Sequence, residues 1–513
     1  MKFEVWERIR KLDRYDWLVF VATSTWMVLM SWYSSLEYFA FVDAQDYGNY
    51  IQAIWSTTKG YLLADASNYF YVQGYPNTIH LDSFLSSHFS PILFLIVPFY
   101  LIYQSPITLV IFQDVLVGLG VIPVYLLGKK LTTSREGFVF AIAYLTNSSL
   151  IFATINNFHA EVFIIPLLTF AIYFGYNRDW KRFGLFALLG CMVDEYTPIL
   201  VGGVVLYLIW SRRLSIRYGV PSLLLVGGYW LFAFYIRMYL GYNPATDNQI
   251  ALTNFSTLGI INPSFLSIPL FAILHPTNAW NALILHYNIK LLFMMFIFSN
   301  TIFLSLYHYK SIVMLLPWLS FSMLSSDASY YSPFLMYPSF LLFGVLIVAV
   351  LGYKDIRKRH TPKLFMYLIL MFILVFSIVS IITVLAYTPQ LNISQSDIQS
   401  QLLIDRLPAN ASIITVGSIF PHVANRIDAW QLNIAPYVNN SFTNIQSHYL
   451  ALNQSKVLID HISPTYAIID YNTTYNTWDN YSSYWLLENL IIPRHYILVA
   501  NSSLIQVYQS PRE

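Results

Sequence analysis

Carboxylates and histidines of this chain gather beside the ends of long apolar segments. Ionisable groups are costly at membrane depth, so such positions indicate function. The residues that we expect on one common face are Asp43, Asp46, His80, Asp82, His88, His159, Glu161, Asp194, Glu195 and Asp327. Because they come from four segments that are distant in the sequence, they predict an active site at a membrane interface.

Asp46 is the candidate general base. It opens the run DYGNYIQ at 46–52, which we expect to be a loop just past the first helix. A carboxylate in such a loop could take a proton from a hydroxyl acceptor. An aspartate that caps a helix is the alternative interpretation. The segment alone leaves both open.

His88 is the candidate centre of a metal site. It lies in the run HFSP at 88–91, and with His159 and Glu161 it could complete a set of oxygen and nitrogen ligands for a hard divalent cation. We expect Mg²⁺ or Mn²⁺, with Asp46, His88 and His159 as ligands. The spacing matches no tight metal motif, and polar residues that anchor helix ends at an interface are the alternative.

The elements that must position these residues are membrane helices. The chain is 57% hydrophobic and 11% charged, whereas a soluble chain carries roughly 25% charge. Lipid must therefore be the solvent for most of it. A spanning helix needs about 20 apolar residues. Such segments lie near 17–38, 106–128, 137–155, 159–176, 182–194, 196–211, 218–239, 285–307, 311–326, 332–353 and 364–387.

Positive charge marks the cytoplasmic ends of such helices. With eleven spans and a cytoplasmic N-terminus, every basic cluster falls inside. The clusters are Lys2 to Arg14, Lys129 to Arg135, Arg178 to Arg182, Arg212 to Arg217, and Lys354 to Lys363. Residues 90–103 are also apolar, but a crossing there would place the second cluster outside. We therefore expect a juxtamembrane helix at 90–103, after a first outer loop at 39–89.

The tail at 388–513 is predicted to be a soluble α/β domain outside the membrane, after a transmembrane domain at 1–387. β-rich stretches at 412–416, 466–469, 496–499 and 504–508 alternate with helical stretches near 421–426 and 484–490. Seven of nine N-x-[ST] sequons lie in this tail, which suits an extracytoplasmic glycoprotein. They are Asn392, Asn410, Asn439, Asn453, Asn472, Asn480 and Asn501. With Cys191 as the single cysteine, no internal disulfide can form.

These motifs together resemble the DUF2079 family of predicted membrane proteins. The resemblance rests on Asp-x-Gly-x-x-x-Gln at 46–52, HFSP at 88–91, FHAE at 158–161, the pair Asp194-Glu195, and the tail segments 407–412 and 420–426. It spans about residues 40 to 510. That family is grouped by fold with the GT-C glycosyltransferases.

The resemblance implies a catalytic aspartate in the first outer loop and a donor sugar on a polyprenyl phosphate. On that basis Asp46 would be the base, and His159 and Glu161 would take part in catalysis. The residues expected to contact donor or acceptor are Asp43, Gln52, His88, Asp194 and Glu195. Cations that could offset a lipid phosphate outside are few, namely Lys59, Arg237 and Lys290.

The leading interpretation is a GT-C-type glycosyltransferase of the plasma membrane, which transfers a sugar on the outer face to a hydroxyl or protein acceptor. A non-catalytic envelope subunit whose outer domain binds a partner is the alternative from another class. Sparse ionisable residues at mid-bilayer and the absence of duplicated halves argue against a transporter. The net charge of +2 does not indicate nucleic acid. Sequons, no disulfides and sparse outer charge favour an archaeal cell surface.

Overall fold

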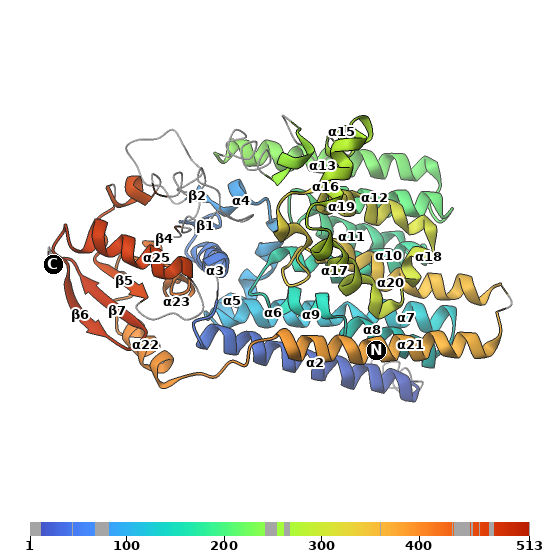
Figure 1. Cartoon of the computed structure of the whole chain (residues 1–513), viewed down its shortest axis with the longest axis horizontal. Coiled ribbons are helices and arrows are strands. Elements are labelled where there is room, and N and C mark those ends of the chain that lie inside the picture. The colour runs from blue at the N-terminus through green and yellow to red at the C-terminus, as the bar shows by residue number, and fades with distance from the viewer. Residues whose placement is uncertain are drawn as a thin grey trace.

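A computed structural model describes residues 12–511 except 44, 67–81, 242–253, 261–266, 360, 433, 435–451, 453–454, 461 and 471–476. His80 and the sequons at Asn439, Asn453 and Asn472 therefore lie outside the described residues. The chain builds a bundle of apolar helices at one end and a five-stranded sheet at the other, with α3 (Gln45–Thr58) between them (Figure 1).

The bundle consists of helices that are apolar around most of their surface, whereas a helix of a soluble protein is apolar on one face only. Its helices are α2 (Arg14–Phe39), α6 (Ile107–Leu119), α7 (Val121–Leu131), α8 (Ser134–Leu145), α9 (Ser148–Ile155), α10 (Ile164–Tyr176), α11 (Trp180–Cys191), α12 (Thr197–Trp210), α13 (Ile216–Tyr239), α17 (Tyr287–Phe298), α18 (Leu304–Tyr307), α19 (Ile312–Leu324), α20 (Ser339–Arg357) and α21 (Lys363–Tyr387). In the central helix α20, 83% of the most apolar 18-residue stretch is buried inside the protein, whereas in α13 only 11% of this stretch is buried. A helix as apolar and as exposed as α13 requires lipid around it.

Among the described residues, four helical segments are long and apolar enough to cross a membrane: Ile107–Leu131, Ile216–Tyr239, Ser339–Arg357 and Lys363–Tyr387. Two bent pairs, α8 with α9 and α16 (Pro276–Ile284) with α17, raise this number to six if each pair is one span. Three shorter apolar helices, Ala160–Tyr176, Thr197–Trp210 and Tyr309–Leu324, coincide with three further expected segments. The described residues thus show a membrane-embedded helical protein, and the number of crossings stays a prediction.

The continuous span expected at 285–307 is wrong, because the chain breaks there. After α17 it forms a short turn η5 (Ser299–Thr301), and Ile302 and Phe303 take positive φ before α18. The Asn300 side-chain amide donates to the Ala143 backbone carbonyl, and its Oδ1 accepts from the Ser377 hydroxyl. These bonds satisfy the polar groups of the break inside the bundle.

Two further differences concern the elements of the bundle, whereas a third stretch follows the expectation of a segment that does not cross. The span expected at 332–353 begins only after Pro338, because proline is tolerated at a helix start and not in its interior. Two short helices, α15 (Ser267–Leu274) and α16, were not predicted. The stretch at 90–103 forms η2 (Pro91–Leu95) and α5 (Val97–Ile102), which are too short to cross a bilayer.

The C-terminal sheet has the order β4-β3-β5-β7-β6. Its strands are β3 (Ile413–Val416), β4 (Ala429–Leu432), β5 (Tyr466–Asp470), β6 (Ile497–Asn501) and β7 (Ile505–Gln509). β3 pairs in parallel with β4 and β5, and the other pairs are antiparallel. Helices α22 (Gln395–Asp405), α23 (Phe420–Val423) and α25 (Thr477–Leu486), with a π-helical turn at Leu487–Ile491, accompany it. Four of these strands match the predicted stretches, and β4 was missed.

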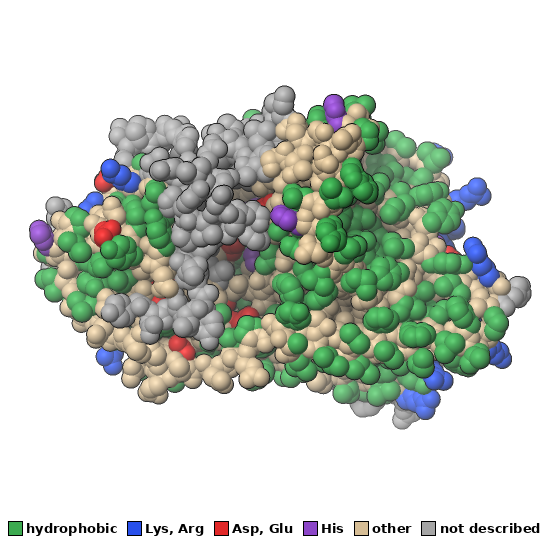
Figure 2. All heavy atoms as spheres, in the orientation of Figure 1, with side chains coloured by type: hydrophobic (Ala, Val, Ile, Leu, Met, Phe, Trp, Pro, Cys, Tyr) green, Lys and Arg blue, Asp and Glu red, His purple; other side chains and the backbone are tan. Residues whose placement is uncertain are grey.

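Charge divides the two ends of the bundle. Figure 2 shows Lys and Arg side chains at the end far from the sheet, and hydrophobic side chains over the surface between. Contacts at that basic end join the termini of several helices: Lys129 pairs with Asp16 at 2.7 Å, Arg357 with Glu136 at 2.8 Å, and Lys354 donates to the Tyr176 hydroxyl.

Candidate functional site

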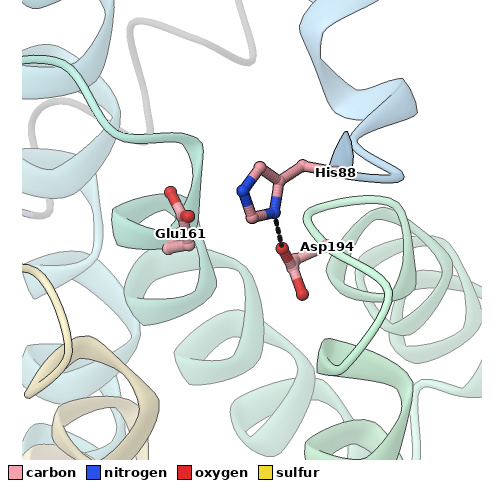
Figure 3. Close-up of side chains that lie close together, drawn as sticks. All are labelled: His88, Glu161 and Asp194. Atoms are coloured by element: carbon pink, nitrogen blue, oxygen red, sulfur yellow. Dashed lines mark ion pairs between the residues drawn. The ribbon is translucent and has the colours of Figure 1, made fainter. Parts of the chain in front are cut away.

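His88, Glu161 and Asp194 meet at the end of the bundle that faces the sheet. Each offers a ligand atom, and these atoms all lie within 4.8 Å of one another. They come from three separate segments and point toward one another (Figure 3). His88 Nδ1 lies 3.4 Å from Asp194 Oδ2, and the two side chains are 48% and 5% exposed. The cluster thus has buried carboxylates and one accessible face, on the side of the imidazole.

The loop of His88 is held by a buried ion pair. His88 follows α4 (Phe84–Ser87), whose last carbonyls have no partner within the helix. Arg237, at the end of α13, donates to the Ser86 and Ser87 carbonyls and pairs with Glu195 at 2.8 Å. Arg237 and Glu195 side chains are each 2% exposed. From the sequence we expect Arg237 to be an outer cation that could offset a lipid phosphate. In the structure its guanidinium instead positions the His88 loop.

Glu195 and Asp194 divide their tasks in the turn between α11 and α12. Glu195 accepts a hydrogen bond from the Phe89 backbone, which fixes the residue after His88. Asp194 accepts from the Tyr196 backbone through Oδ1, and its other oxygen faces His88. Within the acidic pair, Glu195 therefore positions the His88 loop, and Asp194 belongs to the cluster.

Glu161 lies in η3 (Ala160–Phe163), just before α10. The Tyr50 hydroxyl from α3 donates to Glu161 Oε2 at 3.2 Å. His159 Nδ1 lies 3.9 Å from the same oxygen, on the rim of the cluster. The His159 backbone donates to Gln113, whose amide donates to the Thr154 and Asn157 carbonyls. Gln113 thus holds this turn, and sequence reasoning missed it, because a single glutamine in an apolar run carries no motif.

Negative charge dominates the electrostatics. Desolvation lowers the pKa of His88, but the hydrogen bond to Asp194 and the charges of Glu195 and Asp194 raise it to about 10. Burial and then the charges of Glu161, Asp46 and Asp194 hold the pKa of Tyr50 well above its ordinary value. The Tyr50 hydroxyl therefore stays protonated, and it lies in the combined field of three carboxylates.

Asp46 lies in the first turn of helix α3, so the loop expected at 46–52 is wrong. An acid at this position favours the helix through its dipole, in line with the capping alternative. Asp46 is half-buried and is not one of the three residues that lie within 4.8 Å. It stands one helical turn before Tyr50, and its charge acts on that hydroxyl. Asp46 therefore lies beside the cluster, on the other side of Tyr50.

Two other expected substrate contacts are buried away from the cluster. Gln52 donates to the Arg426, Ile427 and Ala429 carbonyls and accepts from the Ala66 backbone, so its amide group joins α3 to the sheet end. Asp43 is 2% exposed, and burial raises its pKa well above the ordinary value. The contacts of Gln52 favour a structural role for it, and a role for Asp43 in substrate binding stays a prediction.

The metal ligand set that the geometry favours differs from the expected Asp46, His88 and His159. His88 is common to both sets, and Glu161 and Asp194 take the other two places. One imidazole and two carboxylates at this separation are a fitting donor set for a hard divalent ion. The two further expected outer cations differ. Lys290 is buried and donates to three carbonyls, whereas Lys59 is exposed and stands over the Trp55 ring.

Comparison with known proteins gives one family match. The family described as Predicted membrane protein (DUF2079) matches residues 38–502. A search of curated proteins found no similar sequence.

Two kinds of solved structure are similar to the chain. The crystal structure of ArnT from Cupriavidus metallidurans bound to undecaprenyl phosphate has 12% identity and a TM-score of 0.49, over 94% of this chain and 98% of that chain. The oligosaccharyltransferase of Archaeoglobus fulgidus has 11% identity and a TM-score of 0.41 in its apo form, over 87% of this chain and 69% of that chain. The same enzyme in complex with Zn and sulfate has 13% identity and a TM-score of 0.36, over 87% and 68%. At TM-scores this low, the likenesses say nothing about activity.

Proposed function

We propose, from the premise that the chain belongs to the DUF2079 family of membrane proteins, that it is a membrane glycosyltransferase of GT-C type. Its donor is a sugar on a polyprenyl phosphate, and the reaction takes place at the outer face. The observation that carries the proposal is the cluster of His88, Glu161 and Asp194, with Asp46 across Tyr50, where the apolar bundle meets the polar sheet end.

The orientation follows from charge. Basic residues at one end of a membrane bundle mark the cytoplasmic side. Helix α4, which directly precedes His88, lies toward the opposite end of the bundle, near α3 (Figure 1). This orientation exposes the cluster, the sheet and the sequons of the tail on the outer side, where a lipid-linked sugar and a hydroxyl acceptor can meet.

In the proposed reaction the acceptor oxygen attacks the anomeric carbon, and the bond from that carbon to the phosphate oxygen breaks. The hydroxyl proton passes to Asp46, which is half-buried and shows no hydrogen-bonded partner that would occupy its carboxylate among the described residues. The polyprenyl phosphate leaves with the electron pair. The Tyr50 hydroxyl fixes Glu161, and the buried ion pair of Glu195 and Arg237 fixes the loop of His88.

The leaving phosphate requires positive charge beside it. His88 supplies one such charge when it is protonated, as its raised pKa favours. A divalent ion such as Mg²⁺ or Mn²⁺, held by His88, Glu161 and Asp194, would supply a larger charge at the same place. The proton on the ring and the metal compete for one imidazole nitrogen.

The test is consumption of a polyprenyl-phosphate sugar by the purified full chain in lipid nanodiscs. Asp46→Asn should lower the rate by about 10²-fold or more, the usual contribution of a general base. Asp405→Asn, at the exposed end of α22, is the matched control and should keep the wild-type rate. An unchanged rate in Asp46→Asn removes Asp46 from its role. A wild-type protein that neither binds nor consumes such a donor overturns the proposed function.

A further inference from the structure

A second polar site lies at the basic end of the bundle. It is a pocket of about 230 Å³ between the ends of α10, α12 and α20 and the turn η6 (Tyr309–Ser311). Its lining residues are Tyr176, Tyr207, Ser211, Arg213, His308, Tyr309, Lys310, Leu351, Lys354, Asp355 and Lys358. The expected functions of the chain do not use this pocket.

Two of its cations are held in place by one buried tyrosine. The Arg213 guanidinium lies over the Tyr176 ring, 3.8 Å from its centre, and donates to the Tyr176 carbonyl at 3.4 Å. Lys354 Nζ donates to the Tyr176 hydroxyl at 2.7 Å. Because both side chains are already ordered, less conformational entropy is lost when they bind a ligand.

The single carboxylate of the lining is occupied. Asp355 Oδ2 lies 2.6 Å from His308 Nδ1, and His308 Nε2 lies 3.2 Å from the Tyr207 hydroxyl. This chain of contacts engages one oxygen of Asp355 with the imidazole.

Positive charge in the pocket is therefore not balanced from within. The lining has four cationic side chains, Arg213, Lys310, Lys354 and Lys358, against the one carboxylate. In the part of the chain that the structure describes, no carboxylate lies within ion-pairing distance of any of the four. Neighbouring cations at the same end differ, since Arg357 pairs with Glu136 and Lys129 pairs with Asp16.

We propose that this pocket binds the phosphate group of an anionic ligand. A planar guanidinium matches phosphate oxygens with two parallel hydrogen bonds, and lysines add point charges from several directions. The tyrosine hydroxyls and Ser211 offer neutral donors beside them. A volume of about 230 Å³ suits a headgroup-sized anion.

The same phosphate chemistry has two possible sources. A basic pocket between helix ends at the cytoplasmic level of a membrane can hold the headgroup of an anionic lipid. It can equally hold a small soluble phosphate compound. The site stands on its own geometry and does not depend on the proposed sugar transfer.

The experiment uses the full chain, purified in detergent and free of phosphate buffer. One arm titrates inorganic pyrophosphate by calorimetry. The other measures retention of phosphatidylglycerol against phosphatidylcholine by native mass spectrometry. Arg213→Gln and Lys358→Gln should each weaken binding about tenfold, the loss expected for one charge-assisted contact. Lys181→Gln, an exposed cation at the same end and outside the pocket, should change nothing.

The arms separate the outcomes. Binding of pyrophosphate alone indicates a soluble ligand, and selective retention of phosphatidylglycerol indicates a lipid headgroup; both support the site if the pocket variants lose it. Equal losses in Lys181→Gln and the pocket variants would reduce the effect to general surface charge and overturn the proposal. So would no binding in either arm. If Arg213→Gln does not fold, Lys358→Gln still decides, because the Lys358 side chain is exposed and makes no hydrogen bond among the described residues.

Discussion

At the scale of single residues, the site separates groups that face a ligand from groups that hold them. Glu161 and Asp194 turn oxygens toward His88. Glu195 instead forms an ion pair with Arg237 and accepts a hydrogen bond from the Phe89 backbone. Two adjacent acids in one turn thus do different things. Only the directions of their side chains distinguish them.

Metal binding is the first property to test at this scale. Mn²⁺ binding to the purified protein, followed by electron paramagnetic resonance, should weaken about tenfold or more in Glu161→Gln and in Asp194→Asn, because each variant removes a carboxylate ligand. His159→Asn should bind nearly as the wild type does, since His159 lies outside the set of three. A loss in His159→Asn equal to the others would restore the ligand set expected from the sequence.

His422 gives the protein a dependence of stability on pH. Its ring stacks on Phe41 and Tyr38, and burial lowers its pKa from 6.5 to about 3. The folded protein keeps the ring neutral, whereas the unfolded chain takes up a proton below about pH 6.5. Stability from this group is therefore complete above that pH and is lost as the pH falls. From about pH 7.5 to about pH 5.5 the free energy of unfolding should fall by about 1.4 kcal/mol.

The measurement is thermal unfolding in detergent at the two pH values. His422→Phe keeps an aromatic ring between Phe41 and Tyr38 and removes the titrating group, so its stability should fall less than that of the wild type. An identical fall in both proteins would assign the pH dependence to other groups.

At the scale of elements, α3 connects the two ends of the molecule. Gln52 binds three backbone carbonyls of the sheet end, and Gln431 in β4 donates to Asn49. The sequence predicts a loop here because the run DYGNYIQ lies just past the first apolar span, in the first outer segment. The helix forms because tertiary contacts on both sides outweigh a weak intrinsic propensity.

Gly48 allows this connection. A β-carbon at Gly48 would overlap a ring carbon of Phe420 in α23. Gly48→Ala should therefore destabilise the contact between α3 and the sheet end by about 1 to 3 kcal/mol, the usual effect of overpacking. Faster limited proteolysis between the bundle and the sheet end, together with a lower melting temperature, would show it. Gly227→Ala in α13 is the control, because a β-carbon there meets nothing within 4 Å; equal effects would argue against the Phe420 contact.

At the scale of the whole molecule, the separation of a basic end from an acidic site and a polar sheet is the basis of the proposed orientation in the membrane. The basic clusters are scattered along the sequence, but helix packing brings their members to one end (Figure 2). The orientation predicts which positions a reagent outside the cell can reach.

Cysteine labelling tests that orientation. Cys191 is buried, so the background should be low. A membrane-impermeant maleimide added to intact cells should modify Gln399→Cys in α22 and should reach Lys181→Cys only after the membrane is opened. Both positions are exposed. The reverse pattern, or equal labelling of both, would contradict the cytoplasmic placement of the basic end and the outer placement of the site.

The sequence alone determined what depends on local composition. Apolar segments of helical length, basic clusters between them, and short β-rich stretches in the tail are additive properties of neighbouring residues, so the bundle and four of the five C-terminal strands could be predicted. The acidic pair at Asp194 and the histidine at His88 could be singled out for the same reason, because they are polar residues at the ends of apolar segments.

Only the tertiary structure decided which of these residues meet. Glu161 and Asp194 became partners of His88, and Gln52 became a joint between α3 and the sheet, because helix packing sets distances that no spacing in the sequence encodes. The break after α17 likewise depends on bonds to Ala143 and Ser377 from distant helices. The phosphate pocket at the basic end is the fullest case, since its four cations come from three separate segments and acquire a common ligand only when those segments pack together.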